Sequence, residues 1–336
     1  MSLRFYSFFS LLLLLSTCGR KDSAQFISVS GIQSVASMGK TLSHEHILVD
    51  FIGADSTGYH RWERDAVIEK VLPYLEEIKA MGYSTLMECT PAYLGRDPWL
   101  LKELAAKTGL QILTNTGYYC ARENKYLPAH AFSEKAEELA ARWISEFKNG
   151  IEGSGVRPGF IKISIDPGIP LLDVQAKIVR AAALTHLQTG LPIASHTGPA
   201  AGAFAQLEIL ISEGVSPEAW IWVHAQNAES ADHIRAAKMG AWISLDNASD
   251  SPKGVDQFVE RLTALKAAGV FDRILISHDA GWYRPGEPEG GSFRPYTAID
   301  QVLLPALKEN GFTEKEIRQL LYDNPARAFV LREVEK

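Results

Sequence analysis

The sequence predicts a single α/β domain over residues 23–336, folded as a (β/α)8 TIM barrel. Eight short apolar runs alternate with longer amphipathic segments, the pattern of repeated strand–helix units. The runs are rich in Val, Ile and Leu and do not alternate strictly, as expected of strands buried on both faces of a parallel sheet. A doubly wound open sheet is the alternative, but no Gly-rich phosphate fingerprint follows the first run.

The eight predicted strands are short, and several end in a polar residue. They span residues 41–50, 83–90, 110–116, 158–165, 191–196, 220–224, 241–246 and 273–279. Because the carboxyl ends of barrel strands form the active-site face, side chains at these ends are the first candidates for chemistry.

The first predicted helix covers residues 64–82. It ends at Gly82, a residue type that commonly stops helices. Pro73 lies inside the segment and lacks the backbone donor that a helix needs. We therefore expect Pro73 to kink or split this helix.

Two further helices carry candidate capping residues. Residues 97–109 open with Asp97 as the candidate N-cap, followed by Pro98 in the first turn. Residues 133–150 open with Ser133 as the candidate N-cap. The remaining amphipathic segments follow the same logic and complete one helix after each strand.

Residues 1–22 are set apart as a leader and tether. Arg4 precedes a short apolar run, which is the layout of a secretory signal. The segment ending at Cys18 resembles the lipobox of bacterial lipoproteins, and a simple cleaved signal with an incidental cysteine is the alternative. We therefore expect an exported protein, either periplasmic or anchored to a membrane only through a lipid on Cys18.

Composition argues against several partners and sites. The net charge of −6 and the absence of a concentrated basic run argue against nucleic-acid binding. Three scattered cysteines form neither a disulfide framework nor a thiolate zinc site, and Cys89 is expected to be a buried hydrophobe.

The first predicted strand contains two histidines one residue apart. In a strand His44 and His46 point to the same face, and Glu45 points away from both. Further polar residues lie on other strands, most of them at the ends: Lys162, His196, His224, Asp246 and Asp279. Two adjacent imidazoles indicate either a metal site or a wet surface, and the rest of this set favours metal.

The chemistry of the set favours two metal ions. Neutral imidazole and carboxylate oxygen are common ligands for zinc, manganese and iron. Four histidines and an aspartate are too many for one ordinary catalytic zinc and suit two neighbouring ions. Lys162 cannot bridge cations as an ammonium, but a carbamate formed with carbon dioxide would offer two anionic oxygens.

Several motifs together resemble the phosphotriesterase and phosphotriesterase-like lactonase family of the amidohydrolase superfamily. They are "HEH", "GFIKI", "ASHTG", "VHAQN" and "SHD", and the resemblance extends from about residue 30 to residues 324–329. The resemblance implies a metal-dependent hydrolase barrel in which one ion is held by His44, His46, carboxylated Lys162 and Asp279. It implies that His196, His224 and the same carbamate hold the second ion.

The resemblance also implies a mechanism. A hydroxide bridging two divalent ions would attack a lactone, a carboxylic ester or a phosphotriester, with Asp279 able to take its proton. Zinc is the expected metal, and manganese, cobalt or iron also suit the ligands. Lactone or ester hydrolysis ranks above organophosphate hydrolysis, and a homodimer is compatible with the family.

Four positions near the expected site bear on specificity. Tyr119 lies where lactonase relatives carry a tyrosine beside the substrate oxygen, although it could be a barrel-mouth aromatic without a chemical role. Asn247 stands where the lactonase pattern has an arginine, which argues against N-acyl-homoserine lactones. In the Gly/Pro-rich loop after the last strand, Arg284 and Arg294 are either solvated or able to meet an anionic substrate group.

Two alternatives to the binuclear hydrolase remain open. A mononuclear deaminase-type amidohydrolase would have no use for Lys162, and a catalytically retired binding lipoprotein would not need a full ligand set. Glu88 could hold a ligand histidine or pair with Arg96. The other five histidines are expected not to bind metal, with one of them in a loop at position 130 and one facing away from the site at position 278: His60, His130, His186, His233 and His278.

Overall fold

The computed structural model describes residues 24–334. The predicted leader of residues 1–22, including Cys18, lies outside the described residues, so export and lipidation stay predictions. Within the described part of the chain, no helix is long and apolar enough to cross a membrane.

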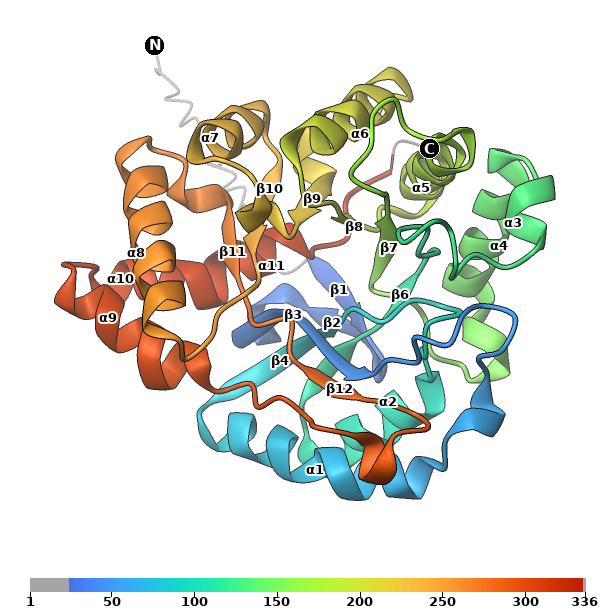
Figure 1. The fold of residues 1–336 in the computed structure, drawn as a ribbon, viewed down its shortest axis with the longest axis horizontal. Helices are drawn as coiled ribbons and strands as arrows, with labels where there is room; N and C mark the ends of the chain where they lie inside the picture. Colours follow the sequence, from blue (N-terminus) through green and yellow to red (C-terminus); the bar gives the residue numbers. More distant parts are fainter. Residues whose placement is uncertain (1–23, 335–336) are drawn as a thin grey trace, which may run out of the picture.

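The strands lie at the centre of the molecule and the helices surround them (Figure 1). Neighbouring strands of the barrel run parallel, in the orders β11-β10-β9-β8-β7-β6 and β12-β3-β4-β5. The barrel strands are β3 (Lys40–Leu48), β4 (Tyr83–Glu88), β5 (Gln111–Leu113), β6 (Asn115–Thr116), β7 (Phe160–Ser164), β8 (Ile193–His196), β9 (Trp220–Val223), β10 (Trp242–Leu245) and β11 (Ile274–Ile276). The order of strands and helices is that of a (β/α)8 barrel, which confirms the predicted fold.

The two groups of strands meet at two seams. At the first, β5 and β6 are consecutive pieces of the predicted strand 110–116, interrupted at Thr114. At the second, the amide of Asp279 donates to the carbonyl of His44 at 3.2 Å, and the Ser43 hydroxyl donates to the carbonyl of Ile276 at 3.0 Å. These bonds hold β11 beside β3.

Three strands were not predicted. The hairpin β1 (Gln25–Ser28) and β2 (Gly31–Ser34) precedes the barrel, and β12 (Gly281–Tyr283) pairs in parallel with β3. β12 places the residues after Asp279 beside His46, because Gly281 is the register partner of His46. The end of the chain's last barrel strand is therefore fixed against the first.

The outer layer contains eleven α-helices within the described residues. They are α1 (Arg64–Ala80), α2 (Pro98–Thr108), α3 (His130–Ser133), α4 (Ala136–Asn149), α5 (Asp173–Thr189), α6 (Ala200–Ser212), α7 (Ser230–Met239), α8 (Pro252–Ala267), α9 (Leu304–Glu309), α10 (Glu314–Arg318) and α11 (Asn324–Ala328). Pro73 does not split α1, which is one continuous helix. Asp97 caps α2 as predicted, because its carboxylate accepts from the amides of Trp99 and Leu100 at 3.1 Å.

The start of α4 corrects the prediction. Ser133 is the last residue of the short helix α3 and does not cap α4. α4 begins at Ala136, and the amide of Lys135 donates to the Glu138 carboxylate at 2.8 Å. An acidic residue three positions on thus fixes this helix start instead of the serine. His130 begins α3 and does not lie in a loop.

The interior of the barrel below the site is packed with apolar side chains. One buried cluster draws residues from successive strands and is closed by the C-terminal Phe329; it includes Met87, Leu113, Phe160, Ile221 and Leu275. A filled interior is the rule for this fold. The predicted metal-ligating side chains lie at or near the carboxyl-terminal end of the barrel, above this apolar cluster.

Candidate metal centre

His44, His46 and Asp279 come together although Asp279 lies more than 230 residues from the two histidines along the chain. Oδ1 of Asp279 lies 3.4 Å from Nε2 of His44 and 3.1 Å from Nε2 of His46. One ligand atom from each of the three residues lies within 4.8 Å of the others, so this group could hold a metal ion. The parity of β3 explains why both imidazoles face the same side.

His196 and His224 form a second pair beside the first. Their ring centroids lie 4.2 Å apart, and the centroid of His224 lies 5.1 Å from that of His44. The Tyr119 hydroxyl lies 3.1 Å from Nε2 of His196. The structure therefore brings all four predicted histidines and Tyr119 to one end of the barrel.

Lys162 lies on β7 and lines the same pocket. Its residue is 2% exposed, and within the described residues its Nζ has no hydrogen-bond partner. Neither ring nitrogen of His44 has a hydrogen-bond partner in this part of the chain. Buried polar atoms are normally satisfied, so these three nitrogen atoms fit a group that the donor set is built to bind.

The backbone is unfavourable at two of these positions. His224 has a φ of 62° and Asp279 has a φ of 53°, both in the left-handed region that non-glycine residues rarely adopt. Each residue follows the end of a strand, where the turn directs its side chain into the pocket. Such conformations persist only where surrounding structure enforces them, and they concentrate at functional sites.

Asp246, directly after β10, is hydrogen-bonded to His224 and lies close to His44. Its Oδ1 lies 2.6 Å from Nδ1 of His224, and its Oδ2 accepts from the His224 amide at 3.0 Å. Its Oδ2 also lies 3.5 Å from Nδ1 of His44. A carboxylate on the outer nitrogen orients a ligand imidazole and leaves its inner nitrogen free for metal.

The pKa shifts follow from burial and from these neighbours. Burial, reinforced by the charge of Lys162, lowers the pKa of His44 to about 4, so the ring is neutral at pH 7 and able to ligate metal. Burial also holds the pKa of His196 well below its usual value. Burial lowers the pKa of His224 as well, but the Asp246 carboxylate outweighs this and raises it. Burial opposes ionisation of Asp279, yet the close imidazoles of His44 and His46 hold its pKa well below its usual value.

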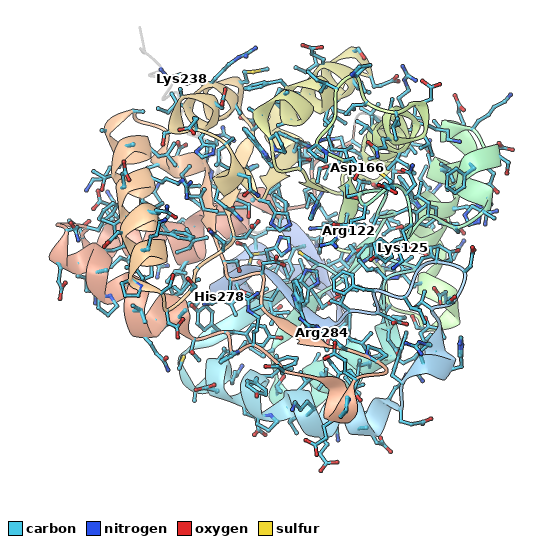
Figure 2. The ribbon with its side chains drawn as sticks, in the orientation of Figure 1. Arg122, Lys125, Asp166, Lys238, His278 and Arg284 are labelled. Carbon is cyan, nitrogen blue, oxygen red and sulfur yellow. The ribbon has the colours of Figure 1, made fainter. Side chains whose placement is uncertain are left out.

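Glu45, between the two histidines of β3, does not line the pocket and contacts the segment around His278, as the alternation of β3 predicts. Oε1 of Glu45 accepts from the His278 amide at 3.0 Å and lies 2.7 Å from Nδ1 of the His278 ring. Its Oε2 accepts from the Ala280 amide at 2.9 Å. Glu45 thus holds the segment that carries Asp279 and His278, and Figure 2 labels His278.

Glu88 resolves to one of its two predicted alternatives. It does not pair with Arg96, which binds Glu146 and Glu152. It accepts from the amide of Thr90 at 3.3 Å, and the Thr90 hydroxyl lies 2.8 Å from Nδ1 of His46. Glu88 therefore acts on a predicted ligand indirectly, through Thr90.

The pocket above these residues has an empty volume of about 570 Å³. Its mouth is formed by loops and by β12, with largely apolar walls made by Val49, Phe51, Pro91, Leu94 and Trp282, and with Arg122. Neither Phe51 nor Arg122 was predicted from the sequence to line the pocket. Only their positions after barrel strands could have identified them, because active sites of this fold form at that face.

The sequence of residues 24–329 matches the model of the phosphotriesterase family. The chain belongs to the phosphotriesterase family. This confirms the resemblance found in the sequence. The protein is therefore a hydrolase of a metal-dependent family, and its His44, His46 and Asp279 could hold a metal ion.

Relatives across the family align with almost the whole chain. An aryldialkylphosphatase from Saccharolobus solfataricus is 30% identical, with 90% of this chain and 99% of the relative covered. A phosphotriesterase homology protein from Escherichia coli is 27% identical, with 87% and 98% covered. An N-acetyltaurine hydrolase from Mus musculus is 26% identical, with 90% and 97% covered. The names of the first and third of these relatives refer to different substrates, although each relative aligns with most of this chain.

Proposed function

We propose that this protein is a binuclear metal hydrolase of lactones or carboxylic esters, with phosphotriesters as the second substrate class. The observation that carries the proposal is the convergence of six side chains on one pocket, where both ring nitrogens of His44 and Nζ of Lys162 have no hydrogen-bond partner among residues 24–334. The six are His44, His46, Lys162, His196, His224 and Asp279. Imidazole and carboxylate ligands suit zinc first, and manganese, cobalt or iron as well.

Lys162 is proposed to act as a carbamate. Its amine would add to carbon dioxide with loss of a proton, and the resulting carbamate would offer two oxygens that share one negative charge as metal ligands. A buried lysine with an unpartnered Nζ supports this assignment. A one-metal deaminase site would leave the position of Lys162 unexplained.

The side chains of this site have distinct proposed roles. Two divalent ions, when bound, supply hydroxide near neutral pH and polarise the substrate oxygen. Asp279 accepts a proton at a carboxylate oxygen, since its low pKa keeps it ionised. Asp246 keeps His224 oriented through Nδ1, and the apolar mouth excludes water from the bound substrate.

Tyr119 is proposed to hydrogen-bond the substrate. Burial raises the pKa of its hydroxyl, so it remains a proton donor at neutral pH. The hydroxyl lies beside His196, at the edge of the metal centre. It can therefore donate to a ring or leaving oxygen of a substrate that reaches the ions.

The proposal is tested by turnover of metal-free and reconstituted protein. The panel contains γ- and δ-lactones, aryl esters, paraoxon and N-acetyltaurine, the last two chosen from the names of the relatives. We expect chelation to abolish turnover and zinc with bicarbonate to restore it, on lactones or aryl esters. Turnover that survives chelation, or reconstituted protein inactive on the whole panel, would contradict the proposal.

A further inference from the structure

Arg122 lies at the mouth of the catalytic pocket without a role in the metal centre. It lines the pocket, and its guanidinium carbon lies 5.9 Å from the centroid of the Phe51 ring. Figure 2 labels Arg122 between Asp166 and Arg284. A cation here faces whatever part of a substrate extends away from the ligands.

Within the described residues, the guanidinium of Arg122 has no hydrogen-bond or ion-pair partner, in contrast to three other arginines near the mouth. Across residues 24–334, it makes no ion pair or hydrogen bond through its side chain. By contrast, Arg61 pairs with Asp50 at 3.1 Å, Arg284 pairs with Glu287 at 3.4 Å, and Arg294 donates to the Asp279 carbonyl at 2.8 Å. Arg61 and Arg294 each join two segments near the mouth, and Arg284 is paired within its own loop, whereas the guanidinium of Arg122 has no partner among residues 24–334.

The backbone that carries Arg122 is held in an unfavourable conformation. Arg122, Glu123 and Asn124 have φ values of 61°, 59° and 61°, three consecutive left-handed residues. Non-glycine residues adopt this region at a cost in energy, so the surrounding contacts must enforce it. Strain of this kind next to a catalytic pocket indicates that the position of the side chain matters.

Asp166, at the end of β7, supplies the enforcing contacts. Its Oδ1 accepts from the Arg122 amide at 2.6 Å, and its Oδ2 accepts from the Glu123 amide at 3.2 Å. Gln175 of α5 donates to the same Oδ2 at 2.8 Å. Both carboxylate oxygens of Asp166 thus accept from backbone or amide donors, and Asp166 holds the backbone of Arg122 without forming an ion pair with its guanidinium.

The remaining walls of the mouth suggest what the free cation binds. They are mostly apolar, with Phe51 and Trp282 stacked edge to face at 5.6 Å between centroids. A pocket with apolar walls and one charged group fits a ligand with an apolar body and one charged end. Guanidinium groups bind planar or tetrahedral oxyanions strongly through paired donors.

We propose that the natural substrate carries an anionic group, a carboxylate or sulfonate, remote from the scissile ester bond, and that Arg122 binds it. This proposal rests on the proposed ester hydrolase function. Asp166 is a positioning residue for this subsite, because it acts only through the backbone of Arg122. The proposed substrates are thus lactones or esters that carry a negatively charged group away from the bond that is cleaved.

The catalytic test compares two esters that differ in the charge of the acyl end: 4-nitrophenyl 5-sulfopentanoate and 4-nitrophenyl hexanoate. We expect the wild type to favour the sulfonate. Arg122→Gln should lower the ratio of the two kcat/KM values about tenfold, the size of one charge-assisted hydrogen bond. Arg122→Lys should retain part of this preference, since it keeps the charge.

A matched control removes a positive charge elsewhere. Lys238 is exposed on α7, and Figure 2 shows it on the periphery, away from the strand ring. Lys238→Gln should leave the ratio at the wild-type value. Asp166→Asn should lower the ratio less than Arg122→Gln does, through the KM of the sulfonate ester, because the loop is loosened while the cation remains.

A binding measurement separates failure of this inference from failure of the hydrolase proposal. Calorimetry with 3-phenylpropane-1-sulfonate and with the matching neutral sulfonamide needs no turnover. We expect the wild type to bind the sulfonate more tightly than the sulfonamide, and Arg122→Gln to lose the difference. Equal binding of both probes, or an unchanged preference in Arg122→Gln, would overturn the inference even if both esters are hydrolysed. A preference for the sulfonate without hydrolysis of any ester would support the subsite and contradict the proposed chemistry.

Discussion

The floor of the pocket lies on strands or just beyond their ends, whereas its mouth lies on loops and the short strand β12. The floor is formed by His44, His46, Lys162, His196, His224 and Asp279. At the floor, His224 is held by Asp246 and His46 by Thr90, so the ligand side chains have fixed directions. At the mouth, Phe51 and Trp282 pack on one another, and Arg122 is left free. The difference indicates that the proposed chemistry depends on side chains held in fixed directions at the strand ends, and that the proposed substrate selectivity depends on side chains of the loops.

The largest expected effect concerns Asp279, the proposed proton acceptor. Asp279→Asn removes the carboxylate that lies beside His44 and His46. Because general-base catalysis contributes about 10²–10⁴ in rate, we expect kcat to fall by that factor. Steady-state kinetics with metal analysis in parallel measures it. An unchanged kcat at full metal content would remove Asp279 from the proposed chemistry.

A smaller effect is expected from the support behind the floor. Asp246→Asn weakens the contact with Nδ1 of His224 and should lower metal affinity about 10–100-fold, as for other carboxylate–histidine supports. Titration against a competing chelator measures the affinity. Asp256→Asn on the exposed face of α8 makes the same chemical change away from the site. Equal affinities in the two variants would show that Asp246 does not tune the metal centre.

A third prediction concerns Gly117, which packs against the backbone of Lys162, and the free energy of unfolding. Gly117 has a φ of 107°, and a Cβ there would lie 2.2 Å from the Lys162 carbonyl oxygen. Gly117→Ala should therefore destabilise the fold by roughly 1–3 kcal/mol through overpacking. Gly214→Ala is the control, because its φ is 88° and a Cβ there meets nothing within 4 Å. Denaturant unfolding that gives the same loss for both would mean that the clash contributes nothing beyond backbone strain.

The smallest effect is expected at the apolar mouth. Trp282→Leu removes part of the wall and should raise KM by about tenfold or less, from the loss of roughly 1 kcal/mol of apolar contact. Metal content should stay at the wild-type value, since Trp282 is not part of the proposed ligand set. A variant that lost metal would show that floor and mouth are not separable.

Much of the floor could be predicted because its information is local. The period of a strand places His44 and His46 together, and the barrel rule gathers the strand ends at one face. The helix cap at Asp97 is equally local and was predicted correctly. Features that depend only on residues close together in the sequence can be predicted without knowing the fold.

The parts that escaped prediction depend on distant residues or on competing signals. Arg122 is free because Asp166, 44 positions away, binds its backbone amide rather than its guanidinium. Glu88 could be distinguished from a partner of Arg96 only when Glu146 was seen to take that place. At the start of α4, both Ser133 and Glu138 are residues of a type that can satisfy the first backbone amides of a helix. The structure uses Glu138, and the sequence alone does not say which of the two is used.

The most direct test of the floor is the number of metal ions held with and without Lys162. Wild-type protein and Lys162→Met are loaded with zinc and bicarbonate, desalted and measured by plasma mass spectrometry. Lys125→Met, an exposed lysine on a loop beside the mouth, is the matched control. The account predicts about two ions per chain in the wild type and the control, and one or none in Lys162→Met. The same metal content in all three proteins would contradict the binuclear centre.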